Sequence, residues 1–291
     1  MKYGALVFLS AFLALAASWG GLILAPQIQV GRGQQETNAV NSAELYPQAR
    51  PGLARQGLSV YRANGCADCH TQQVRQTGSQ CDVVLVDAGT NAEALAEALM
   101  KANVGISKAS AAGLAVGLPK PILRRVPANL AKSTVSAIQS VGAKGKVEIV
   151  ALGPDIARSW GPRRNVAADY LFDDPVLLGS QRIGPDLANV GLRLPDPTWH
   201  LRHLYEPRSE VKGSLMPPYR FLFERRKTGP HPSSEALQLS GKLAPPAGWE
   251  IVPRPEALAL VAYLRSLRSD TPLFEAPMSS SAPAQTNAPA R

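Results

Sequence analysis

The spacing of hydrophobic and polar residues differs from one segment of the chain to the next. An uncharged apolar run from Tyr3 to Ala25 is followed by a polar stretch, and Gly52 to Asn64 then repeats apolar residues at helical spacing. Residues 81–152 place short apolar strands between helical patterns, and Pro255 to Leu267 is another helical stretch. The pattern predicts an anchor helix, two packing helices and a separate α/β unit between them.

The apolar run at the N-terminus is long enough to cross a membrane. At about 1.5 Å per residue, a helix from Tyr3 to Ala25 spans the hydrocarbon core of a bilayer. Ala14-Leu15-Ala16 resembles a signal-peptide cleavage site, so a cleaved signal is the alternative, but the apolar run continues beyond it. We expect a retained anchor over residues 1–30, a polar linker over 31–51 and an exported remainder.

Residues 79–152 differ in composition from the chain on either side. They contain no aromatic residue, whereas aromatic and proline residues are frequent again from Gly153. Their pattern predicts the order βααβαβ, typical of a small α/β sandwich. We expect an inserted domain with its strands and helices at Cys81–Val86, Ala92–Asn103, Ser107–Val116, Pro121–Val126, Ala128–Val141 and Lys146–Leu152.

Composition and charge exclude several classes of protein. An apolar content of 45% fits neither a disordered chain nor a multi-span membrane protein, and 25 prolines predict much irregular structure. The net charge of +9 comes from scattered basic clusters without interleaved aromatics, so we expect no nucleic-acid partner. Of three cysteines only Cys81 lies outside one short motif, which excludes a disulfide framework and suggests that Cys81 is a buried apolar residue.

The other two cysteines belong to Cys66-Ala67-Asp68-Cys69-His70, a pattern typical of haem c attachment. Two thiols at this spacing match the two vinyl groups of haem, and the imidazole of His70 becomes the proximal iron ligand. A zinc site needs two further ligands, and a thioredoxin-like motif follows a βαβ unit; the sequence provides neither near the motif. We expect one covalent haem c.

A second iron ligand must come from elsewhere in the chain. Of four methionines, the others are the initiator, a residue of the inserted domain and a residue of the C-terminal tail, which leaves Met216. Met216 follows His70 by 146 residues, a normal separation only if the inserted domain is subtracted. His200 and His203 are competing ligands. His/Met ligation suits electron transfer and leaves no open iron position.

The sequence Gly184-Pro185-Asp186-Leu187 supplies a candidate partner for the proximal histidine. The second ring nitrogen of a metal-bound histidine needs a hydrogen-bond acceptor, which orients the ring and raises its basicity. The carbonyl of Pro185 on a rigid loop would provide that acceptor. A plain turn is the alternative interpretation of this tetrapeptide.

Several strings of residues together resemble one protein family. They are Gly65-Cys66-x-x-Cys69-His70-Thr71-Gln72-x-Val74-Arg75, Gly179-Ser180-x-Arg182-x-Gly184-Pro185-Asp186-Leu187-Ala188-x-Val190-Gly191-x-Arg193, Trp199-His200-x-x-His203-Leu204-Tyr205-x-Pro207-Arg208 and Ser214-x-Met216-Pro217-x-Tyr219. The family is the membrane-anchored mono-haem subunit, subunit II, of cbb3-type cytochrome c oxidases. The resemblance covers the anchor and residues 45–77 and 153–267.

The resemblance implies a mainly α, class I-like cytochrome c domain, formed discontinuously by residues 52–78 and 153–270 on the periplasmic side of the cell membrane. It implies that His70 and Met216 ligate the iron and that single electrons pass to a haem–copper catalytic subunit, alongside other cytochrome subunits. The chain itself would be a non-catalytic electron-transfer subunit. Candidate contacts of the haem propionates are Arg75, Arg182, Arg193 and Tyr219.

The inserted domain is similar to the C-terminal domain of the bacterial ribosomal stalk protein. The matching strings are Asp82-Val83-Val84-Leu85, Pro119-Lys120-Pro121 and Gly142-Ala143-x-Gly145-Lys146-Val147-Glu148. An exported domain does not meet the ribosome, so we expect a structural or docking role. Beyond the last helix, the low-complexity residues 271–291 predict a disordered tail.

Three other functions compete with that of an oxidase subunit. A freestanding membrane-tethered or secreted cytochrome would carry electrons without an oxidase. A haem peroxidase needs an open iron position and usually a second haem motif, which this sequence lacks. A recognition protein would act through the inserted domain.

Overall fold

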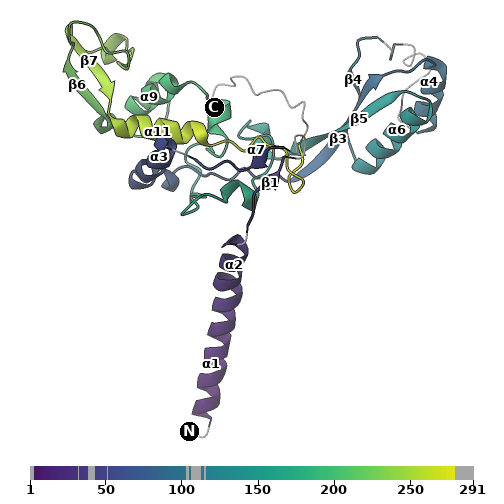
Figure 1. Ribbon diagram of the computed structural model, residues 1–291, viewed down its shortest axis with the longest axis horizontal. Helices are drawn as coiled ribbons and strands as arrows, with labels where there is room; N and C mark the ends of the chain where they lie inside the picture. The colour runs from purple at the N-terminus through teal and green to yellow at the C-terminus, as the bar shows by residue number, and fades with distance from the viewer. Residues whose placement is uncertain are drawn as a thin grey trace.

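The computed structural model describes residues 3–31, 33–38, 43–50, 52–102, 105, 113–114 and 116–278. A long helix extends from a body that is formed by the described residues before position 78 and after position 152 (Figure 1). A separate α/β unit lies to one side of this body and has its own core.

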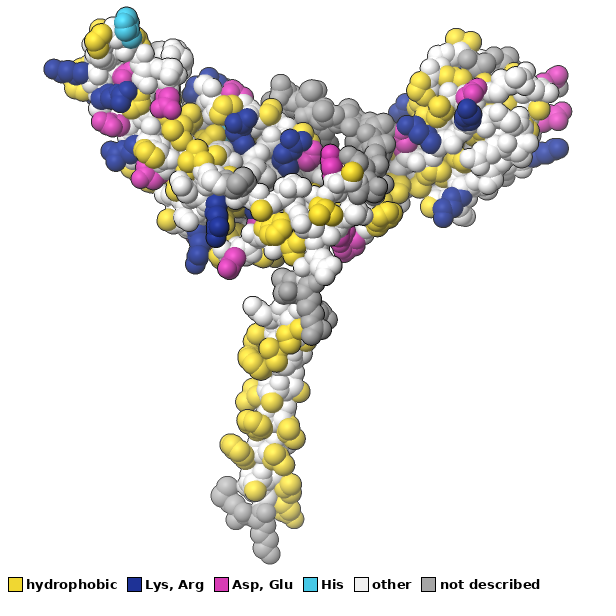
Figure 2. All heavy atoms as spheres, in the orientation of Figure 1, with side chains coloured by type: hydrophobic (Ala, Val, Ile, Leu, Met, Phe, Trp, Pro, Cys, Tyr) yellow, Lys and Arg dark blue, Asp and Glu magenta, His cyan; other side chains and the backbone are white. Residues whose placement is uncertain are grey.

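The N-terminal helix is apolar along its length. α1 (Gly4–Trp19), a π-helical turn (Gly20–Leu24) and α2 (Ala25–Gly31) continue into one another. The segment Gly4–Ile28 is long and apolar enough to cross a membrane, and it packs against no other part of the described chain. Figure 2 shows its apolar side chains facing outwards along the rod. This candidate membrane span begins at Gly4, one residue after the start of the predicted run, and continues past Ala25 to Ile28.

The segment after the anchor is fastened to the body. Strands β1 (Glu36–Thr37) and β2 (Leu45–Tyr46) pair antiparallel. Tyr46 Oη donates a 2.7 Å hydrogen bond to the carboxylate of Asp169, which also receives two bonds from the fully buried guanidinium of Arg163. The expected polar linker therefore docks on the body at β2.

Two helices from opposite ends of the body's sequence cross in its core. At the crossing of α3 (Gly52–Ala63) with α11 (Pro255–Ser266), a Cβ added to Gly57 would lie 1.9 Å from a backbone carbonyl oxygen of α11. One turn later Tyr61 packs on Tyr263, with ring centroids 5.2 Å apart. The two helices that the sequence predicts therefore pack on each other, and glycine is what allows the close approach.

Short helical segments fill most of the remaining body, in agreement with its many prolines. They are η2 (Cys66–Asp68), α7 (Pro154–Ala157), η3 (Ala167–Tyr170), α8 (Val190–Arg193), α9 (Pro197–Tyr205), α10 (Pro207–Glu210), η4 (Arg220–Leu222) and η5 (Gly241–Leu243). The described body is thus mainly helical, and loops connect most of these segments.

The body also contains a β-hairpin that the sequence did not predict. β6 (Phe223–Lys227) pairs antiparallel with β7 (Trp249–Pro253) along their whole length. The proline-rich sequence of residues 225–253 is typical of loops, and both strands lie within or beside it, so that interpretation is wrong at the two ends of the stretch. Ile251 and Val252 are buried in β7, but five-residue strands separated by a proline-rich connection give only a weak pattern.

The α/β unit agrees closely with the predicted strands and helices. Its sheet has the order β4-β3-β5 and is antiparallel throughout. The predicted short helix at Ser107–Val116 lies for the most part outside the described residues. The described elements are β3 (Gly78–Asp87), α4 (Ala92–Lys101), β4 (Lys120–Val126), α6 (Ala128–Ser140) and β5 (Lys144–Leu152).

The chain enters and leaves the α/β unit at one place. β3 and β5 pair from Gly78↔Leu152 onward, and the backbone N–H of Thr77 donates to the carbonyl of Leu152 at 2.8 Å. Gly153 follows directly, and a Cβ there would lie 3.1 Å from the Thr77 nitrogen. The two connections to the body are therefore neighbouring strands of one ribbon.

The C-terminal stretch is ordered further than expected. Leu273 and Ala276 are buried and pack with Val166, and the guanidinium of Arg163 donates to the carbonyl of Thr271 at 2.7 Å. The prediction of a disordered tail from residue 271 is therefore wrong for the first part of that range, because the side chains of Leu273 and Ala276 are buried against the body. Residues 279–291 lie outside the described part of the chain.

We expect Gly57→Ala to lower the free energy of unfolding by about 1–3 kcal/mol, because its Cβ would force α3 and α11 apart. Urea denaturation of the solubilised chain measures this loss. Gly78→Ala is the matched control, since no atom outside its immediate chain neighbours lies within 4 Å of a Cβ there. Equal losses in the two variants would contradict the close helix crossing.

Candidate functional site

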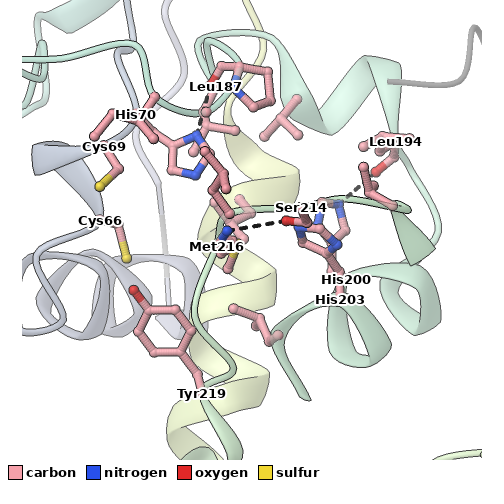
Figure 3. Close-up of a pocket in the computed structure, with 18 of the residues that line it drawn as sticks. Cys66, Cys69, His70, Leu187, Leu194, His200, His203, Ser214, Met216 and Tyr219 are labelled. Atoms are coloured by element: carbon pink, nitrogen blue, oxygen red, sulfur yellow. Dashed lines mark hydrogen bonds between the residues drawn. The ribbon is translucent and has the colours of Figure 1, made fainter. Parts of the chain in front are cut away.

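A cavity of about 760 Å³ lies in the body, a volume typical of cofactor sites. Cys66, Cys69, His70 and Met216 all line it, although Met216 follows His70 by 146 residues in the chain. Figure 3 shows the two cysteine sulfur atoms near His70 on one side of the cavity. The loop of Met216 forms another part of the same wall.

The motif that begins at Cys66 folds as a tight turn at the end of α3. Gly65 has a φ of 65°, and a Cβ there would lie 2.9 Å from a carboxylate oxygen of Asp68. The backbone N–H groups of Cys69 and His70 both donate to the carbonyl of Cys66, at 3.3 and 3.0 Å. This compact turn presents two thiols and an imidazole to one cavity. Burial raises the pKa of the Cys66 thiol to about 11, so the thiol is protonated at neutral pH.

The His70 ring is held by the Gly184-Pro185 pair. Its Nδ1 lies 2.8 Å from the carbonyl oxygen of Pro185, and because only a protonated nitrogen can donate to this acceptor, Nε2 carries the free lone pair. A Cβ on Gly184 would lie 2.2 Å from the ring, so this glycine allows the loop to approach the imidazole. Burial lowers the pKa of His70, which favours the neutral ring that metal ligation requires.

The opposite part of the wall contains the competing ligands. Met216 is half-buried against the body's core, and its backbone N–H donates to Ser214 Oγ at 3.2 Å. His200 is almost fully buried, and its Nε2 is committed to the Leu194 carbonyl at 2.8 Å. His203 stacks on Trp199, and its Nδ1 has no partner among the described residues. Met216 and His203 remain candidates for the second ligand, and so does Nδ1 of His200, which this hydrogen bond leaves without a proton in the neutral ring.

Basic residues surround the cavity, and none of the described residues that line it is acidic. Arg193 is only 9% exposed, donates to the Asp186 carbonyl at 2.8 Å, and has a pKa that burial lowers to about 10. A buried cation in a wall without carboxylates favours a ligand with negative charge. The basic lining residues are Arg158, Arg182, Arg193 and Lys212.

The structure brings three of the four candidate propionate contacts to the cavity. Arg182, Arg193 and Tyr219 line it. Arg75 does not: its side chain is exposed, and its backbone N–H donates to Asp155 at 2.8 Å. The direction of the extended chain after His70 carries the Arg75 side chain to the surface, so its proposed contact is not supported.

The tripeptide Gly-Pro-Asp occurs twice, ending at Asp155 and at Asp186, and both aspartates hold the chain that follows His70. Asp186 is fully buried and accepts from Thr71 Oγ1 at 2.6 Å and from the backbone N–H of Gln73 at 2.7 Å. Asp155 is 2% exposed and accepts from the backbone N–H of Arg75. Sequence reasoning missed Asp155, although the repeated tripeptide was the signal that could have found it.

These donors fit a haem c. Two neighbouring thiols, the imidazole of His70 and one thioether line a mostly apolar cavity that also has four basic side chains in its wall. The described residues contain no group of three or more His, Cys, Asp or Glu side chains that could hold a bare metal ion. Three buried polar atoms without a hydrogen-bond partner in the described chain all belong to lining residues, and they are Tyr61 Oη, Arg182 Nε and His203 Nδ1.

Comparison with known proteins points to the same class of protein. A family model described as cytochrome C oxidase, mono-heme subunit/FixO, matches residues 157–236. This match supports a mono-haem subunit of a cytochrome oxidase. It includes the Pro185 and Met216 parts of the cavity wall, and it lies outside the Cys66 motif and the α/β unit. No curated protein matches the chain.

We expect Asp186→Ala to lower the free energy of unfolding by about 3 kcal/mol or more, because it leaves the Thr71 hydroxyl and the N–H groups of Gln73 and Ala188 without an acceptor in a buried site. Urea denaturation measures the loss. Asp196→Ala, which removes an exposed N-cap with two acceptor bonds, is the control and should cost about 1 kcal/mol. A loss no larger than that of the control would show that Asp186 does not hold the segment.

Proposed function

We propose that the cavity holds one covalent haem c and that the chain is the electron-transfer subunit of a cbb3-type cytochrome c oxidase. The observation that supports this most is that Cys66, Cys69, His70 and Met216 line one cavity, part of whose wall lies within the segment similar to mono-haem oxidase subunits. The bound iron would take up and release one electron at a time.

Each lining residue then has a chemical role. Cys66 and Cys69 form the thioethers, and His70 binds the iron through Nε2. The Pro185 carbonyl keeps the imidazole in the required tautomer and orientation. Met216 would supply the second protein ligand of the iron, since it lines the cavity and packs against the core.

The cationic wall serves the haem propionates. Arg193 lacks a carboxylate partner and is buried, so a propionate would supply the negative charge that it needs. Arg182 and Tyr219 are the other two candidates that line the cavity. A charge-assisted hydrogen bond from an arginine to a carboxylate is stronger than one between neutral groups, which favours these contacts.

Two features favour an electron carrier over a haem enzyme. Ligation of the iron by both His70 and Met216 would leave no open position for a peroxide. The N-terminal helix would keep the body at the membrane, on the exported side where haem c is attached, beside the haem–copper subunit and other cytochrome subunits. A freestanding membrane-tethered cytochrome is the alternative, and the match to an oxidase subunit favours the complex.

The α/β unit would serve as a docking or structural domain inserted into the cytochrome. Its separate core and single point of connection support an insertion, and the resemblance to the ribosomal stalk domain rests on its sequence. We propose no catalytic role for it.

We expect the double variant Cys66→Ser/Cys69→Ser to lose all covalent haem, because no thiol remains at the cavity to form a thioether. Haem staining of the denatured chain on a gel measures this. Cys81→Ser, in the separate core of the α/β unit, is the control and should retain the stain. A stained double variant would disprove covalent attachment at this motif.

We expect Met216→Ala to abolish the far-red absorption band of a sulfur-ligated ferric haem, because the thioether is removed from the cavity. His203→Ala should retain that band, since in this proposal His203 is not the ligand. The optical spectra of both purified variants check the assignment. If His203→Ala changed the ligation while Met216→Ala did not, the second axial ligand would be His203.

We expect a haem–copper subunit to copurify with the full chain from detergent-solubilised membranes, because the matched segment is similar to oxidase subunits. Mass spectrometry of the purified complex identifies the bound subunits. Recovery of a haem-containing chain without any oxidase subunit would instead support the freestanding carrier.

A further inference from the structure

A buried carboxylate lies beside the cavity at the point where the α/β unit rejoins the body. Asp155 is in α7, directly after β5, and is 2% exposed. Both of its carboxylate oxygens accept from Arg182 Nη1, at 2.7 and 2.8 Å, and one also accepts from the Arg75 backbone. Asp155 itself does not line the cavity, whereas Arg182 does.

The guanidinium of Arg182 is held in one orientation. Besides the bonds to Asp155, its Nη2 donates to the carbonyl of Gln73 at 2.6 Å. Its central carbon lies 5.3 Å from the centre of the Trp160 ring. The side chain is 21% exposed, so solvent screens its charge only in part. The wall of the cavity therefore carries a fixed positive charge, with the carboxylate of Asp155 hydrogen-bonded behind it and that of Asp186 3.8 Å from Nη2.

Such a pair acts on any redox group in the cavity. A positive charge close to a haem favours the reduced iron, which carries one positive charge less than the oxidised iron. A negative charge slightly further away offsets part of that effect, and weak screening in a buried site preserves both contributions. Charge and hydrogen bonding around a cofactor are among the means by which a protein tunes its potential.

We propose that Asp155 is a positioning residue, which fixes Arg182 at the cavity wall and offsets its charge, and that this pair sets the reduction potential of the bound haem. The inference rests on the proposed function, because it requires a haem in the cavity. The role of Asp155, tuning the potential through Arg182, differs from that of Cys66, His70 and Met216, which would hold the haem.

Redox titration of the full haem-loaded chain, at about pH 8 so that a carboxylate stays ionised, tests the proposal. Asp155→Asn removes the negative charge but keeps an acceptor, so the midpoint potential should rise. Arg182→Gln removes the positive charge, so the potential should fall. The double variant should lie between the two single variants. A purely structural role predicts no shift or shifts of the same sign, and either result would overturn the proposal.

Arg158→Gln is the matched control. Arg158 also lines the cavity, lies 5.1 Å from the Trp160 ring centre and is 3.8 Å from Asp155, but its side chain is 58% exposed. Solvent should screen its charge, so the potential should shift much less than in Arg182→Gln. An equal shift in the control would show that any charge near the cavity has the same effect, which contradicts a special role for the pair.

Two further measurements separate the possible failures. Haem content of the unmodified chain is determined first; a chain without haem would overturn the proposed function and this inference together. Normal haem content with unmoved potentials would overturn the inference alone. Urea unfolding of the same variants, all held in the oxidised state, provides a coupling energy for Asp155 and Arg182 without a redox titration, and independent, additive losses would show that the two side chains do not act as a pair.

Discussion

The position of the extended chain after His70 is the constraint on which the site depends. This segment makes few regular backbone pairs, so its buried polar groups need partners from elsewhere. Asn165 accepts from the N–H of Val74 at 2.7 Å, and the Tyr170 hydroxyl donates to the carbonyl of Gln72 at 2.6 Å. With the two aspartates of the Gly-Pro-Asp tripeptides, these residues fix the direction of the chain and, through it, the orientation of His70.

All of these partners follow the α/β unit in the sequence. A smaller part of the cavity wall, with Cys66, Cys69 and His70, is therefore made before the unit and the larger part after it, and neither part is complete alone. The arrangement is possible because β3 and β5 form a ribbon whose two ends are neighbours. The unit therefore takes the place of a short loop between two neighbouring points of the body. Its core, around Leu85, Leu95 and Ile138, is separate from the core of the body.

The sequence predicted what depends on local pattern. The helices α3 and α11 and the strands of the α/β unit follow from spacing and composition. What it missed depends on contacts between distant residues: Asp155 bonds to a backbone group 80 positions away, and Leu273 is buried only because the body offers a pocket. Arg75 is the opposite case. It belongs to a string of residues typical of the family, but such a string does not show in which direction the side chain of an extended segment points.

The hydrogen bond from Tyr46 to Asp169 has a consequence for the proposed exchange of electrons with other proteins. Little chain lies between the end of α2 and β1, and β2 is bound to the body through this tyrosine. If the candidate span Gly4–Ile28 crosses the membrane, as in the proposed function, a body on such a short connection would stay close to the bilayer surface and would not diffuse away as a free carrier does. A redox partner would then have to reach it by lateral movement in the membrane or by stable assembly, and the length of the connection would restrict its partners to proteins whose redox sites lie at the same distance from the membrane.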